Sequence, residues 1–101
     1  MTAKVDLWDA GGLHTWAEIN SDKTLTISGQ DLHPPGPFGD EYEYVLTVAP
    51  ADIDTVVVAL GGAPGDDVLP LLEANGPMIK NTGEQAWLQS LGITPQLWSW
   101  Y

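Results

Sequence analysis

The residues best suited to chemistry in this sequence are acids on either side of a proline-rich segment. Asp31 precedes the segment, and four residues follow it in the order Asp40, Glu41, Tyr42, Glu43. Paired carboxylates can serve as general acid and base, but that work needs a cleft for which a small domain seldom has room. Because Glu41 and Glu43 alternate onto one face of a strand, they predict a solvated acidic surface instead.

The sequence lacks the motifs typical of metal binding, nucleophilic catalysis and phosphate binding. His14 and His33 each stand without a second histidine or a cysteine at ligand spacing, so we expect no metal site. No serine lies in a Gly-x-Ser-x-Gly turn, and no glycine pattern matches a phosphate loop. We therefore expect a protein that is not an enzyme and that carries no cofactor.

Charge limits the class of partner. Fourteen Asp and Glu residues oppose three lysines and no arginine, which gives a formal net charge of -11 over 101 residues. Nucleic acids and anionic membranes present phosphates that this chain lacks the cations to neutralise. We therefore expect no nucleic-acid partner and no membrane partner, whereas a large partner attracted by electrostatics would be a basic protein.

Length and composition predict one domain over residues 1–101. A hydrophobic content of 44% with five tryptophans supports a modest core and sets the chain apart from disordered sequences. No cysteine, no signal-peptide pattern and no apolar run of about 18 residues is present, so the expected compartment is the cytoplasm. The oligomeric state stays open.

Apolar residues that recur at every second position predict four strands in the first half of the chain. These patterns cover residues 5–8, 13–19, 24–28 and 41–48. Short turns rich in glycine, asparagine and aspartate separate the first three, which favours antiparallel pairing. Three prolines between residues 31 and 40 remove backbone donors and predict an exposed loop.

Helical spacing replaces the strand pattern after Pro50. Pro50 suits the first position of a helix whose apolar residues recur up to Leu60, before two glycines. Asp67 should cap a second helix, which residues 75–77 should end.

Two more helical segments are expected nearer the C-terminus. Thr82 should open a capping box with the two residues after Gly83, ahead of a helix that carries Trp87 on its core face. Gly92 should close that helix. Residues 94 and 95, threonine and proline, then predict one further helical turn that carries the last aromatic residues.

These elements predict an α+β fold, with an antiparallel four-stranded sheet followed by two or three short helices packed on one face. The place of the fourth strand within the sheet stays open. The other sheet face should be solvated and should carry Glu18, Glu41 and Glu43. Trp8 and Trp16 fall out of phase with the aliphatic rows, so we expect both on this outer face, partly covered by the proline-rich loop.

A family resemblance rests on motifs spread over nearly the whole chain. They are Gly29-Gln30-Asp31-Leu32, Asp40-Glu41-Tyr42-Glu43-Tyr44, Ala59-Leu60-Gly61-Gly62 and Leu91-Gly92-Ile93 ahead of Trp98-Ser99-Trp100. With these motifs the chain resembles small acidic proteins common in actinomycetes (Actinobacteria), some of which are similar to immunity proteins in size and charge. The resemblance implies one domain in a bacterial cytosol and assigns no functional residue.

Three functions are compatible with the sequence. The first is a non-enzymatic protein-binding domain, an immunity protein or antitoxin-like inhibitor of a basic partner such as a nuclease. Its expected partner-binding residues are Asp31, Phe38, Asp40, Glu41, Tyr42 and Glu43. The alternative is a small-ligand-binding or catalytic domain, and the third is an acidic domain without a charged partner. A flat acidic face would favour the first function, and a deep pocket with convergent polar groups would favour the second.

Overall fold

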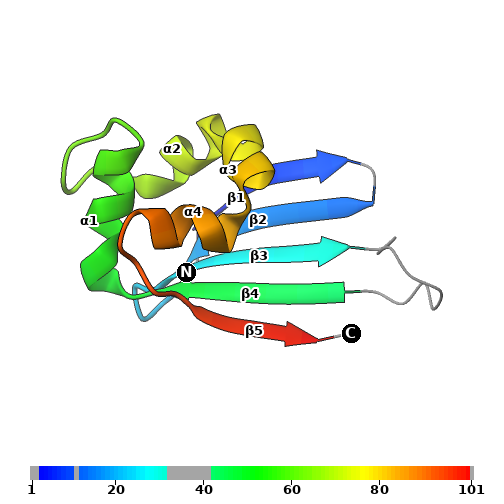
Figure 1. Ribbon diagram of the computed structural model, residues 1–101. Helices are drawn as coiled ribbons and strands as arrows, with labels where there is room; N and C mark the ends of the chain where they lie inside the picture. The colour runs from blue at the N-terminus through cyan, green and yellow to red at the C-terminus, as the bar shows by residue number, and fades with distance from the viewer. Residues whose placement is uncertain (1–2, 11, 32–41, 101) are drawn as a thin grey trace.

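Five strands form one antiparallel sheet in the computed structural model of the protein, which describes residues 3–10, 12–31 and 42–100 (Figure 1). In sequence order and in sheet order they are β1 (Ala3–Ala10), β2 (Leu13–Ile19), β3 (Leu25–Asp31), β4 (Tyr42–Val48) and β5 (Gln96–Trp100). Each strand pairs with the next, so the fourth strand continues the meander. The predicted α+β class is confirmed, with one strand more than expected.

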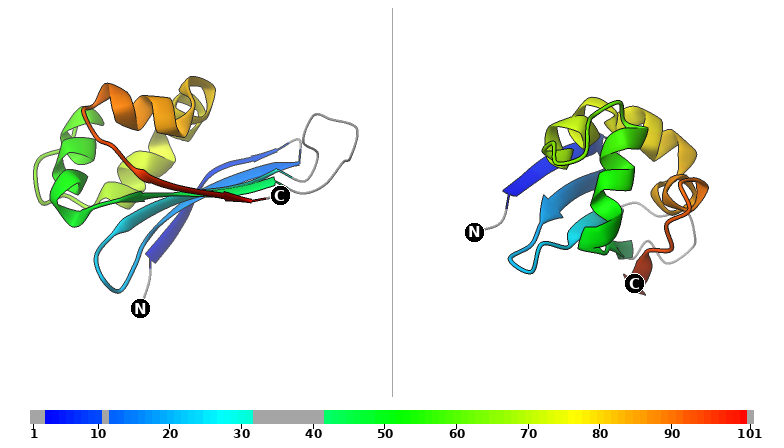
Figure 2. Two further views of the ribbon diagram at one scale, coloured as in Figure 1. Left: turned by 60° about the horizontal axis from the view of Figure 1, so that its bottom comes forward. Right: turned by 90° about the vertical axis from the view of Figure 1, so that its left-hand side faces the viewer.

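Four short helices connect β4 to β5. They are α1 (Pro50–Ala59), α2 (Val68–Ala74), α3 (Gly76–Thr82) and α4 (Glu84–Ser90). All four lie on one side of the sheet, and none of the described helices lies on the other side (Figure 2). The structure is therefore a two-layer arrangement with a helix-covered inner face and an open outer face.

Local signals in the sequence locate several helix ends correctly. Pro50 is the first residue of α1, and Gly61, at φ +89°, follows the last turn. The Asp67 carboxylate accepts a hydrogen bond from the Leu69 amide at 3.1 Å and caps α2. Gly92 has φ +82° just beyond α4, as a glycine at a helix C-terminus does.

One helix prediction is wrong, and one helix was not predicted. Thr82 is the last residue of α3, and the N-cap of α4 is Gly83. Since Gly83 has no side chain to accept a hydrogen bond, the expected capping box does not form. Residues 75–77 do end the second helix as predicted, since α2 stops at Ala74 with Asn75 as its C-cap. The next helix, α3, follows directly from Asn75 and was not predicted from the sequence, so the helices number four instead of two or three. The Asn75 side-chain amide donates to the Leu71 carbonyl oxygen at 2.8 Å, which satisfies a terminal acceptor of α2.

The expected helical turn after residue 95 is also wrong, since the chain forms β5 there. Leu97 pairs with Leu46 and Trp98 with Val45 in the β4–β5 register. A helix of one or two turns has little stability of its own, whereas the free edge of β4 offers a ladder of backbone hydrogen bonds. Pairing with β4, which is distant in sequence, therefore determines the conformation of residues 96–100.

A β-bulge in β1 separates the two N-terminal tryptophans. Asp6 pairs with Trp16 and Trp8 with Thr15, so that Leu7 is an extra residue between the two pairs. Trp8 therefore lies on the helix side, where the Lys80 Nζ of α3 is 4.6 Å from a ring centroid. The expectation of two outer tryptophans is wrong for Trp8, and the expected loop cover lies outside the described residues.

The core fills the space between the inner sheet face and the helices, and Trp87 is buried in it as predicted. Its largest fully buried side chains include Leu25, Ile27, Leu46, Leu72, Ile79 and Leu88. Gly76, the first residue of α3, packs directly on β1, because a Cβ atom there would overlap the Leu7 carbonyl oxygen. The helix layer therefore contacts the backbone of the bulge itself.

Replacing Gly76 with alanine tests this contact. Alanine favours a helix over glycine, so local propensity alone predicts a gain in stability. The overlap with the Leu7 backbone instead predicts a loss of about 2–3 kcal/mol in the free energy of unfolding, measured by urea denaturation. Gly65→Ala is the control, since Gly65 has open space but φ +93°, and it should cost about 1 kcal/mol. A Gly76→Ala protein as stable as the wild type would contradict the close approach.

Candidate protein-binding face

The outer face of the sheet carries three rows of side chains that the register places side by side. Across β1 to β4 the rows are Lys4, Glu18, Thr26, Thr47; Asp6, Trp16, Ser28, Val45; and Asp9, His14, Gln30, Glu43. We call these twelve residues the outer face. Figure 2 shows that the helices leave this side of the sheet open.

Trp16 lies in the middle row of the outer face and forms its aromatic centre. The His14 ring is 4.9 Å from the Trp16 ring, centroid to centroid, and the Lys4 Nζ is 5.0 Å from a Trp16 ring centroid. Ser28, on the next strand, is 5% exposed although no described helix covers it. Trp16 is half-buried, and the outer face therefore has a large apolar centre that a partner could desolvate.

Carboxylates surround that centre. Asp6 accepts a hydrogen bond at its Oδ1 from the His14 Nε2 at 2.9 Å, with 61% of the Asp6 side chain exposed. Glu43 is half-buried and accepts at Oε1 from the Gln30 Nε2 at 3.2 Å. Glu18 and Asp9 complete four carboxylates, against the single lysine Lys4.

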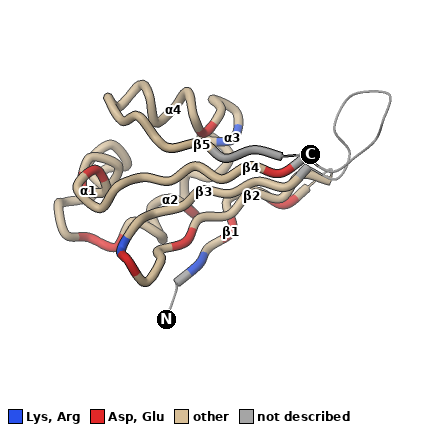
Figure 3. The backbone as a smooth tube through the Cα atoms, turned by 90° about the horizontal axis from the view of Figure 1, so that it is seen from below, with Lys and Arg blue, Asp and Glu red and all other residues tan. Residues whose placement is uncertain are grey.

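The lysines leave most of this negative charge uncompensated. Lys4 and Lys80 lie over tryptophan rings, and Lys23 is exposed in the turn between β2 and β3 at φ +70°. Among the side chains that the structure describes, Asp6 and His14 make the one contact within 4 Å between a carboxylate and a basic group. Figure 3 shows acidic positions on the sheet, in the β2–β3 turn and in the helical layer, so the negative charge is spread over several elements.

One other acid is fixed by local hydrogen bonds in that turn. Asp22 Oδ1 accepts from the Thr24 hydroxyl at 2.6 Å and from the Thr24 amide at 3.0 Å. The hydroxyl hydrogen bond, followed by the amide one, lowers the pKa of Asp22 below its ordinary value. Asp22 therefore stays ionised over the whole neutral range and adds to the charge at this end of the sheet.

The structure describes three of the six expected partner-binding residues, namely Asp31, Tyr42 and Glu43. Glu43 belongs to the outer face. Asp31 and Tyr42 form the next pair of the β3–β4 register, beside the Gln30–Glu43 pair. Phe38, Asp40 and Glu41 lie outside the described residues. Trp100 pairs with Glu43 in the β4–β5 register, so β5 extends the same rows.

Sequence reasoning missed the residues that β1 and the first half of β2 contribute. Asp6, His14 and Lys4 come together around Trp16 because the β1–β2 hairpin places them on neighbouring strands. The alternation of Trp16 with Thr15 and Ala17 was the available signal, and it correctly placed the Trp16 ring outside.

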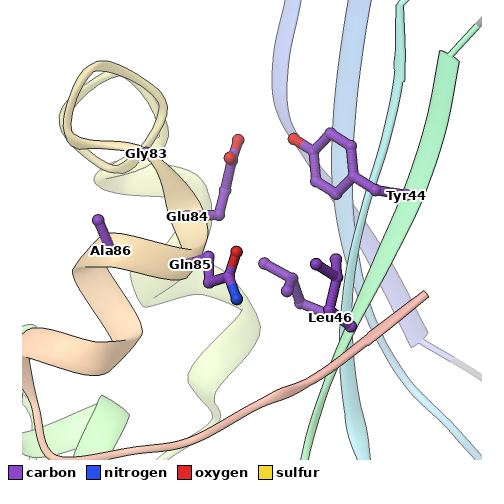
Figure 4. A pocket seen from close by; sticks show the side chains of 7 residues that line it. Tyr44, Leu46, Gly83, Glu84, Gln85 and Ala86 are labelled. Carbon is purple, nitrogen blue, oxygen red and sulfur yellow. The ribbon is translucent and has the colours of Figure 1, made fainter. Parts of the chain in front are cut away.

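A shallow cleft lies on the opposite side of the sheet, between α4 and the β4–β5 pair. Its volume is about 220 Å³, and the side chains lining it come from Tyr44, Leu46, Glu84, Gln85, Ala86 and Leu97, beside Gly83 (Figure 4). Small-molecule sites usually enclose about 300–1,000 Å³. The cleft is below that range, so it is better suited to one side chain than to a whole ligand.

Metal-binding geometry is not found in the part of the chain that the structure describes, where no three His, Asp or Glu side chains gather to hold an ion. The described helices include none with the length and apolar character to cross a membrane. Fold and face thus define an α+β domain with an open acidic sheet.

No protein-family model, curated protein or solved structure matches the chain.

Contacts on the outer face should contribute little to folding. An exposed contact between a carboxylate and a histidine, such as Asp6–His14, is typically worth less than about 1 kcal/mol, since water screens it and both side chains lose freedom. A double-mutant cycle with Asp6→Asn and His14→Gln, followed by urea unfolding at pH 7, should give a coupling free energy below that value. A coupling above about 2 kcal/mol would make the pair part of the folding core.

Proposed function

We propose that this protein is a non-enzymatic binding domain that masks a basic protein in the cytoplasm. Immunity proteins and antitoxin-like inhibitors that neutralise nucleases act in this way, and a basic nuclease is the partner class that we favour. The observation that carries the proposal is the open outer face, with Trp16 at its centre and four carboxylates around it.

This arrangement has the anatomy of a protein interface. Binding free energy is concentrated in a few central residues, among which tryptophan is enriched, and polar residues at the rim exclude water and fix the register. Trp16 fits the central role because His14 and Lys4 hold its ring from two sides. A preorganised ring loses little conformational entropy when a partner covers it.

Charge supports a basic partner. The whole chain has a formal charge of -11, and the outer face presents four carboxylates beside one lysine. Lysine and arginine side chains around a nuclease active site bind phosphates, and the same side chains would meet carboxylates here. The expected mechanism is steering of the encounter by long-range attraction, followed by steric occlusion of the partner's substrate site.

The ligand-binding alternative has less support. The cleft between α4 and the β4–β5 pair has a volume of about 220 Å³ and is open to solvent. It is therefore smaller and less enclosed than a typical small-molecule site.

Neutralising the outer face should slow association. The double variant Glu18→Gln/Glu43→Gln keeps the shape of both side chains and removes two of the four negative charges of the outer face. With the most basic protein domain encoded beside this gene as partner, the association rate constant at low salt should fall about fivefold, and its dependence on ionic strength should flatten. Stopped-flow fluorescence at two salt concentrations measures both effects.

A matched control removes the same charge from the helical side. Asp52→Asn/Glu73→Gln changes one residue of α1 and one of α2, away from the outer face. This control should retain most of the wild-type rate constant. Equal slowing by both double variants would mean that only total charge matters, and the assignment of the outer face would then be wrong.

A further inference from the structure

The two edges of the sheet are built differently. β1 carries Lys4, Asp6 and Asp9 and a bulge, and charges and bulges are the devices that keep an edge strand from pairing with other chains. β5 has the sequence Gln-Leu-Trp-Ser-Trp, with no charge and no proline, and its register with β4 is continuous. The β5 edge is therefore the one whose backbone remains open to another strand.

Leu97 makes this edge attractive to a partner. It is 46% exposed, one of three large hydrophobic residues that the described structure leaves so accessible. Its register partner Leu46 is 1% exposed, so the apolar surface runs from the core out to the edge. An added strand would cover Leu97 and continue the sheet at the same time.

The cleft beside β5 provides a second feature. Leu46, Leu97 and the Tyr44 ring form one wall, and the first turn of α4 forms the other (Figure 4). The position of the Tyr44 ring is fixed by Gly29, since a Cβ atom on Gly29 would overlap it. The β4–β5 wall of the cleft is thus largely apolar, and its Tyr44 ring packs against Gly29.

Glu84 is the one charged residue among those that line the cleft. Its side chain is half-buried, and its carboxylate points to the same opening as the Tyr44 hydroxyl (Figure 4). Among the described residues, the Glu84 carboxylate forms no hydrogen bond and no ion pair. A carboxylate opposite an apolar wall fits a lysine or arginine, whose aliphatic stem packs on the apolar surface while its cation reaches the acid.

We propose that the β5 edge and this cleft together bind an extended basic segment of a partner protein by strand addition. Backbone hydrogen bonds to β5 supply affinity, and a lysine or arginine in the cleft beside Glu84 supplies specificity, as side-chain pockets do along other strand-addition sites. A second copy of this chain is the poorer occupant, because each copy has a formal charge of -11 and would bring another Glu84 toward the same edge.

This inference goes beyond the proposed function, because it assigns a mode of binding and a surface other than the outer face. A partner that uses both surfaces would place one segment along β5 and a basic surface over Trp16. Each surface has its own variants, so that failure of one assignment leaves the other measurable.

A synthetic peptide provides the probe. It has blocked ends, alternates lysine with threonine and has about eight residues, the length of an ordinary strand. Titrated into the ¹⁵N-labelled protein, it should shift the amide resonances of β5 and of Glu84 most. It should also slow hydrogen exchange along β5. Shifts centred on Trp16 and Glu43 instead would overturn the strand-addition site.

Two comparisons isolate the two contributions. The same peptide with alternate amides N-methylated, so that one edge lacks backbone donors, should bind at least about tenfold more weakly. Glu84→Gln should weaken binding of the unmodified peptide about fivefold, whereas the matched control Glu73→Gln, on the exposed side of α2, should not. Equal binding of both peptides, or equal weakening by both variants, would overturn the proposal.

The oligomeric state gives an independent check. Sedimentation at the protein concentration of the titration should show a monomer, with the β5 edge unoccupied. A dimer that Leu97→Lys dissociates would assign the edge to a second copy and overturn the proposed occupant.

Discussion

The contact between Gly76 and the bulged backbone at Leu7 sets the relation between the two layers. The bulge presents the Leu7 carbonyl to α3, and only a residue without a side chain can approach it there. The same bulge moves Trp8 to the helix side, next to Lys80, and leaves Trp16 on the outer face. One inserted residue therefore positions the helix layer and also places one of the two N-terminal tryptophans, Trp8, on the helix side and the other, Trp16, on the outer face.

The helix layer protects one half of the molecule and leaves two surfaces accessible. The outer face is broad, acidic and centred on Trp16, whereas the β5 edge is narrow, uncharged and bordered by Leu97 and Glu84. Both suit a basic protein, but for different reasons: the outer face attracts charge over a distance, and the edge recognises an extended backbone at contact. With two of the three lysines placed over tryptophan rings, few cations remain to mask either surface.

The sequence predicts a structural feature correctly where a local signal determines that feature. Pro50, Asp67 and Gly92 act within one turn of helix, and their roles were predicted from sequence and confirmed. The bulge has no such signal, since Asp6, Leu7 and Trp8 alternate as a regular strand would. β5 follows a threonine–proline pair typical of a helix start, and it becomes a strand because β4, far away in sequence, offers a free edge. The candidate face was foreseen as acidic, with Glu18 and Glu43, but its centre depends on hairpin pairing that no single stretch of sequence encodes.

The order of the strands has a consequence for how the sheet assembles. The β1–β2 and β2–β3 pairs close over short turns, whereas β5 reaches β4 only after the whole helical segment between Val48 and Gln96. Closing that long loop costs more entropy and makes the β4–β5 pairing the contact of highest sequence separation in the sheet, so we expect it to form late in folding. A strand bound to β5 would stabilise the closed form by mass action. The strand that must close the longest loop is thus the one whose attachment a bound partner would strengthen directly.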